Sequence, residues 1–75
     1  MSTVVVSGWL AVDCDVSDAT PVQIAVGTPA DFKPAFRDWV DGRRVAKIRV
    51  PEGPGRVRVF LKVGGAVTDV GVVTL

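Results

Sequence analysis

The chemistry that this sequence could perform depends first on a set of cations in its second half. Five cations and one aromatic residue alternate with aliphatic residues there: Lys47, Arg49, Arg56, Arg58, Phe60 and Lys62. Basic strands that carry aromatic rings can bind single-stranded nucleic acid through phosphate attraction and base stacking. One ring is a small stacking platform, however, and the formal net charge of +1 is low for such a protein. We therefore favour a basic surface that faces a protein partner or water, with a nucleic-acid-binding β-barrel as an alternative.

Groups suited to catalysis are scarce. The chain contains no histidine and one cysteine, so it can form neither the Ser–His and Cys–His pairs of nucleophilic enzymes nor a zinc site of several thiols. The acidic segment Asp13–Asp18 has carboxylates spaced as in a calcium loop, but it lacks the glycine and the distal glutamate of an EF-hand. We interpret it as a turn in which aspartates cap backbone amides. The sequence predicts no enzyme, metal, cofactor or small-molecule substrate.

The two tryptophans, Trp9 and Trp39, are the largest apolar side chains. Tryptophan is enriched among the residues that dominate binding at interfaces, and it could also serve as a platform for a sugar ring. A small sandwich equally needs one or two large rings to fill its core. We predict that one tryptophan lies in the core and the other at an interface. Cys14 is expected to be a small buried apolar residue.

Strands must position these side chains, because the composition favours extended chain. Seventeen of the 75 residues are valine, whose branched Cβ favours strands over helices. Turn residues separate six β-rich segments, which are Thr3–Val12, Val22–Val26, Phe36–Val40, Arg44–Val50, Arg56–Val63 and Val67–Thr74. About six strands at this spacing predict an all-β fold in a single domain over residues 1–75, either an antiparallel β-sandwich or a small β-barrel.

The segment from Arg44 to Val63 has the clearest pattern. Aliphatic residues alternate with the cations on both sides of Pro51–Gly55, which gives each arm an aliphatic face and a cationic face. Prolines and glycines favour a tight connection, so we predict a hairpin with all its cations on one face. We expect the last strand to pair with this hairpin through the turn at Gly64-Gly65.

The apolar content exceeds what a chain of this size needs for its own core. Hydrophobic residues make up 48% of the sequence, whereas a domain this small buries only about 60% of its unfolded surface. Val4, Val5 and Val6 are apolar at consecutive positions, so both faces of their strand would need to be covered. Charge is uneven too, with six acids and two bases in residues 1–42 and seven bases and two acids in residues 43–75. We expect a homo-oligomer or another multi-copy assembly.

The sequence gives no indication of a membrane partner or of export. About 20 consecutive apolar residues are needed to span a bilayer, and the apolar runs here are far shorter. Residues 1–12 lack the basic start and the continuous apolar stretch of a signal peptide. We expect a protein that is made in the cytoplasm and is not secreted.

The stretch from Asp38 to Leu75 resembles the C-terminal half of a small immunoglobulin-like β-sandwich. It has an inner strand, a P-x-G-P-G corner at Pro51–Gly55, a long alternating strand, and the pattern D-x-G-x-V in the last strand. Modules of this type occur in the virions of tailed bacteriophages, as capsid decoration proteins and as parts of tail or fibre subunits. The chain departs from the pattern because it has no corner tyrosine and only 75 residues, which leaves open that a neighbour supplies one strand.

The resemblance implies a non-enzymatic structural protein located in the virion. Such a capsid decoration or minor capsid protein stabilises the shell by binding the major capsid protein or another virion protein. A tail- or fibre-associated adhesive module is the alternative. The residues that we expect at the protein interface are Val4, Val5, Val6, Trp9, Trp39, Lys47, Arg49, Arg56, Arg58, Phe60 and Lys62.

Overall fold

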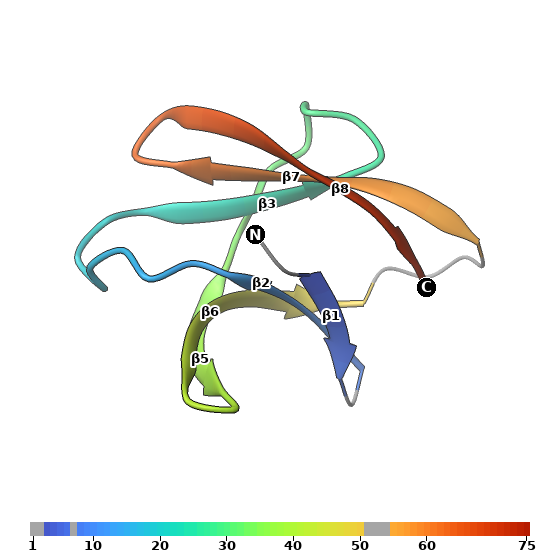
Figure 1. Cartoon of the computed structure of the whole chain (residues 1–75). Coiled ribbons are helices and arrows are strands. Elements are labelled where there is room, and N and C mark those ends of the chain that lie inside the picture. Colours follow the sequence, from blue (N-terminus) through green and yellow to red (C-terminus); the bar gives the residue numbers. More distant parts are fainter. Residues whose placement is uncertain (1–2, 7, 51–54) are drawn as a thin grey trace.

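The computed structural model describes residues 3–6, 8–50 and 55–75, without the side chains of Val4 and Val6. Its strands are β1 (Thr3–Val6), β2 (Trp9–Asp13), β3 (Val22–Val26), β4 (Lys33–Pro34), β5 (Phe36–Val40), β6 (Arg43–Arg49), β7 (Arg56–Val63) and β8 (Ala66–Thr74). They form two four-stranded antiparallel sheets, the lower and upper layers of Figure 1, so the predicted all-β class is confirmed. Nowhere in these residues is there a helix with the length and hydrophobicity of a membrane span.

The strand order is that of an immunoglobulin-like sandwich. One sheet has the order β1-β2-β6-β5 and the other has the order β4-β3-β7-β8. The first corresponds to the A-B-E-D sheet of immunoglobulin domains, and the second to their C-F-G sheet with a C′ strand added at the edge of strand C. The sandwich expected from the sequence is therefore confirmed, and this chain itself supplies four strands to each sheet.

The number of strands differs from the six expected. The predicted strand Thr3–Val12 is two strands, because Gly8 has a positive φ of 81° and makes the turn that pairs β1 with β2. The two-residue strand β4 lies outside the predicted segments. The bounds of the other five strands agree with the prediction to within one residue.

The predicted hairpin from Arg44 to Val63 is wrong. β6 pairs with β2 and β5 in one sheet, whereas β7 pairs with β3 and β8 in the other. The chain therefore changes sheets between Arg49 and Arg56, and residues 51–54 lie outside the described part. Alternation identifies the apolar face of a strand but not the neighbour of that strand, and a Pro–Gly segment suits a crossing as well as a turn. The pairing expected for the last strand is confirmed, since β8 follows β7 through the turn at Gly64-Gly65.

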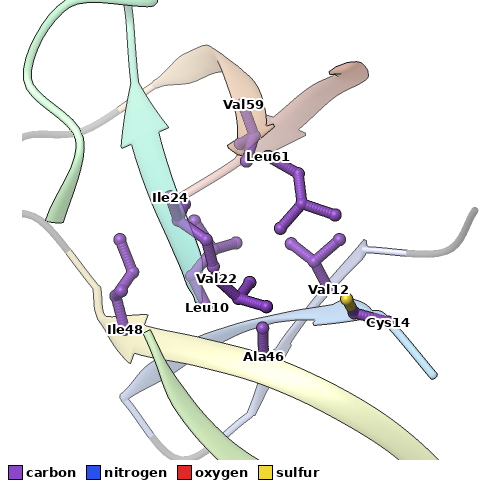
Figure 2. Packing of buried hydrophobic residues seen from close by; sticks show 9 residues of the cluster. All are labelled: Leu10, Val12, Cys14, Val22, Ile24, Ala46, Ile48, Val59 and Leu61. Atoms are coloured by element: carbon purple, nitrogen blue, oxygen red, sulfur yellow. The ribbon is translucent and has the colours of Figure 1, made fainter. Parts of the chain in front are cut away.

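Aliphatic side chains from both sheets build the core. Figure 2 shows Leu10, Val12, Ala46 and Ile48 of one sheet facing Val22, Ile24, Val59 and Leu61 of the other. Cys14 is buried beside them, as predicted, with 8% of its surface exposed. Neither Trp9 nor Trp39 is among the buried residues, so the prediction of one tryptophan in the core is wrong. The inner faces of two packed sheets interdigitate, and branched aliphatic residues fill this space without a ring.

We predict that Ile24→Ala lowers the free energy of unfolding by about 2 to 5 kcal/mol, because it leaves a cavity between the sheets. Val72→Ala is the control, since Val72 is 43% exposed on the edge strand β8. This second change should cost about 1 kcal/mol or less. Urea unfolding followed by tryptophan fluorescence measures both values, and equal losses would contradict the assigned core.

Candidate functional site

The outward face of the β1-β2-β6-β5 sheet gathers aromatic and cationic side chains. In the register of this sheet, Trp9 lies opposite Arg49, and Lys47 lies between Ala11 and Phe36. Directly opposed residues of antiparallel strands share a face, and the residues that alternate with these in β2 and β6 point into the core. We call Trp9, Phe36, Lys47 and Arg49 the aromatic–cationic surface.

Trp9 is the centre of the aromatic–cationic surface. The Nζ atom of Lys47 lies 4.5 Å from the centroid of the Trp9 ring, and the Cζ atom of Arg49 lies 4.6 Å from it. Phe36 meets Trp9 edge-on, with 5.8 Å between the ring centroids and 89° between the ring planes. Cations over an indole and edge-to-face rings are both attractive arrangements. The four side chains therefore fix one another's positions.

A carboxylate fixes the position of Lys47. The Nζ atom of Lys47 donates a hydrogen bond of 2.6 Å to Oδ2 of Asp38, and the amide of Trp39 donates one of 2.8 Å to Oδ1. The hydrogen bond from Lys47, followed by that from Trp39 and by the charge of Lys47, holds the pKa of Asp38 below its usual value. Asp38 therefore stays ionised at neutral pH and keeps the ammonium group over the Trp9 ring.

One aromatic ring of this surface remains largely open to solvent. Phe36 is 62% exposed, whereas the small outward residues Ala11 and Val45 are covered, with 2% and 1% exposure. Tryptophan and arginine are the residue types that most often dominate the energy of protein–protein binding, and aromatic rings are enriched in such interfaces. The aromatic–cationic surface therefore has the composition of a protein-binding site.

The sandwich divides the cationic face that the sequence predicts. Lys47 and Arg49 lie on the aromatic–cationic surface, but Arg56, Arg58, Phe60 and Lys62 belong to the outward face of the opposite sheet. The aliphatic residues that alternate with these cations face one another across the core, so the two cationic rows must face apart. The prediction of one basic face is wrong for the same reason as the predicted hairpin.

Two cations of the second row, Arg58 and Lys62, have partners within the chain. Arg58 forms an ion pair with Asp69, 2.8 Å between Nη1 and Oδ2, and the Nζ atom of Lys62 lies 5.4 Å from the centroid of the Phe32 ring. A hydrogen bond from the amide of Gly71, together with that from Arg58, holds the pKa of Asp69 below its usual value. This row lacks an exposed tryptophan, so it resembles a solvated strand face more than a binding site.

Of the other predicted interface residues, Trp39 and Val5 lie apart from the aromatic–cationic surface, whereas Val6 is paired with Trp9 in the sheet register. Trp39 is 63% exposed at one end of the sandwich, where the Cζ atom of Arg44 lies 5.3 Å from its ring centroid. Val5 is 40% exposed on the edge strand β1, and the side chains of Val4 and Val6 lie outside the described part. Sequence analysis misses Phe36, because alternation within its strand does not tell which strand lies beside it.

Two of the three aspartates of the Asp13–Asp18 segment, Asp13 and Asp18, form ion pairs with arginines. Oδ2 of Asp13 lies 3.2 Å from Nη1 of Arg43, and the guanidinium group of Arg44 binds Oδ1 of Asp18. The hydrogen bond from Arg44, and then its charge, lowers the pKa of Asp18. Within the described ranges, no three potential metal ligands lie together.

The chain matches no protein-family model, no curated protein and no solved structure. Its function is therefore inferred from the chemistry of its surfaces. Of these, the aromatic–cationic surface combines one exposed ring, ordered cations and a supporting carboxylate.

We predict that Asp38→Asn weakens the acid dependence of stability. Because the folded pKa of Asp38 is lowered, its stabilisation is present above the unfolded value of about 3.9 and is lost as pH falls through the folded pKa. The unfolding free energy of the variant should therefore fall less steeply than that of the wild type below about pH 4. Lys47→Met should likewise make the fall of the unfolding free energy below about pH 4 less steep, since it removes the group that donates to Asp38. Urea unfolding at a series of acidic pH values measures how steeply the unfolding free energy falls with pH. If both variants keep the wild-type slope, the assigned ion pair between Lys47 and Asp38 is contradicted.

Proposed function

We propose that this chain is a non-enzymatic structural subunit that binds another protein through its aromatic–cationic surface. The observation that carries the proposal is the ordered cluster of Trp9, Phe36, Lys47 and Arg49 on one outward sheet face, with Phe36 62% exposed. A lone folded chain gains nothing by leaving such a ring in water. A partner that covers the ring recovers the free energy of burying it.

The chemistry of the surface favours a particular kind of partner. Desolvated aromatic rings at the centre supply affinity, and the cations beside them favour acidic groups on the opposing surface. Lys47 is already engaged by Asp38, so Arg49 is the cation better able to reach a partner's carboxylate. We therefore expect an apolar patch with carboxylates at its edge on the partner protein.

A virion is the assembly that we propose for this subunit. The resemblance of Asp38–Leu75 to phage immunoglobulin-like modules supports the proposal, and the strand order of the two sheets is compatible with it. In this role the chain decorates the shell as a minor capsid protein and binds the major capsid protein. Many copies bound to one shell allow each contact to be modest while the particle as a whole is stabilised.

Association with particles tests this function. Particles are isolated on a density gradient from host cells that express the chain with a C-terminal tag, and the bound chain is quantified by immunoblot. The wild-type chain should co-sediment with the particles. Phe36→Ala combined with Arg49→Glu should reduce the bound amount by about tenfold or more, since loss of one dominant contact costs about 2 kcal/mol.

Arg56→Glu is the matched control. Arg49 ends β6 and Arg56 begins β7, both are exposed, and they belong to opposite sheets. The control changes the net charge by the same amount as Arg49→Glu, so it should retain the wild-type amount on the particles. A wild-type chain that stays at the top of the gradient contradicts the virion role, and equal loss in both variants contradicts the assigned surface.

A further inference from the structure

A crevice opens between the two sheets at the end of the sandwich that carries the Asp13–Asp18 segment. Its volume is about 920 Å³, and its walls include Asp15, Trp39, Arg44, Leu61, Val63 and Thr68. Pockets that take up ligands have volumes of roughly 300–1,000 Å³ and are mostly apolar with a few polar groups. The crevice therefore has the size and the composition of a binding site, and it lies apart from the aromatic–cationic surface.

The crevice exists because the inward rows of the two sheets continue past the core without filling the space between them. Arg44 follows the inward row of Ala46 and Ile48 in β6, and Trp39 lies directly opposite Arg44. Trp39 nevertheless remains 63% exposed. Residues of an inward row normally meet the facing sheet, so a tryptophan that is exposed there leaves a wall that is largely uncovered.

The walls of the crevice are held in position by interactions within the chain. The guanidinium group of Arg37 donates hydrogen bonds to the carbonyl oxygens of Cys14 and Val16, which ties the acidic segment to β5. Arg44 binds Asp18 and lies over the ring of Trp39. Little free energy would therefore be lost in ordering the walls when a ligand enters the crevice, which favours binding.

The charge around the crevice selects among ligands. Its lining contains Asp13, Asp15, Asp18, Arg43 and Arg44, and the two arginines form ion pairs with Asp13 and Asp18. Asp15 is exposed and forms no ion pair with any described residue. A cation brought by a ligand would meet this carboxylate at the rim, whereas an anion would be repelled.

We infer that this crevice binds a protein segment in which an apolar side chain is flanked by lysine or arginine. The apolar side chain enters between Trp39 and Val63, and the flanking cation pairs with Asp15. The inference rests on the proposed function, because it gives the subunit a second protein contact at one end of the sandwich. The end loops are also the part of an immunoglobulin-like domain that variable domains use for recognition.

Peptide binding followed by two-dimensional ¹H–¹⁵N NMR tests the inference on the full chain. The probe is acetyl-Arg-Leu-Arg-amide, and the readout is the shift of the Trp39 indole and of the amides of Val63 and Thr68. Acetyl-Glu-Leu-Glu-amide tests the charge requirement, and acetyl-Arg-Gly-Arg-amide tests the apolar requirement. The first peptide should shift these signals, and each of the other two should bind at least about tenfold more weakly.

Two variants locate the binding. Thr68→Phe places a ring in the crevice from an exposed position of β8 and should abolish the shifts, while Asp15→Lys should weaken the binding by about tenfold. Asp31→Lys makes the same charge change outside the crevice lining and should bind like the wild type.

The inference is overturned if Arg-Gly-Arg binds as well as Arg-Leu-Arg, if Thr68→Phe leaves the shifts unchanged, or if the neutral sugar methyl α-D-glucoside produces the same shifts instead of the peptide. Particle association of the Thr68→Phe variant separates this inference from the proposed function. Retained association together with lost peptide binding supports both assignments as independent contacts. If the Arg-Leu-Arg peptide does not bind the wild-type chain, the inference about the crevice is contradicted. The proposed function is unaffected by that result, because the aromatic–cationic surface has its own test.

Discussion

The aliphatic rows of β6 and β7 face each other across the core because the chain changes sheets between these two strands. Alternation along each strand then forces the cations of the two rows outward in opposite directions. One outward row meets Trp9 and Phe36, and the other meets Asp69 and Phe32. The crossing therefore decides which charged residues act together, and the proposed protein contact depends on it.

A core built without rings has a direct consequence for function. Leu10, Ile24 and Val59 are fully buried, and valine, isoleucine and leucine rows close the space between the sheets. Trp9, Phe36 and Trp39 are then left outside the core, where two of them are more than 60% exposed. Large rings in water oppose solubility unless something covers them. Their position on the outside is the basis of the proposed contacts with other proteins.

The sequence predicts the strands well and their neighbours poorly. The valine content and the alternation identify the all-β class, and the segments Val22–Val26 and Arg56–Val63 are strands with the bounds expected. Gly8 divides the first strand because a turn needs only one residue with positive φ, which leaves the apolar pattern on either side uninterrupted. Pairing is a long-range property, so the neighbours of β6 and the meeting of Phe36 with Trp9 appear only when the chain is folded.

Cross-strand contacts of β6 and β7 test the central claim most directly. Nuclear Overhauser effects between Hα protons of opposed residues in ¹³C,¹⁵N-labelled protein report which strands are neighbours. The account predicts that β6 shows such contacts to β2 and β5, for example between Ala11 and Lys47, and that β7 shows them to β3 and β8. A ladder of contacts between β6 and β7 would contradict it, because a hairpin would return all five cations to one face.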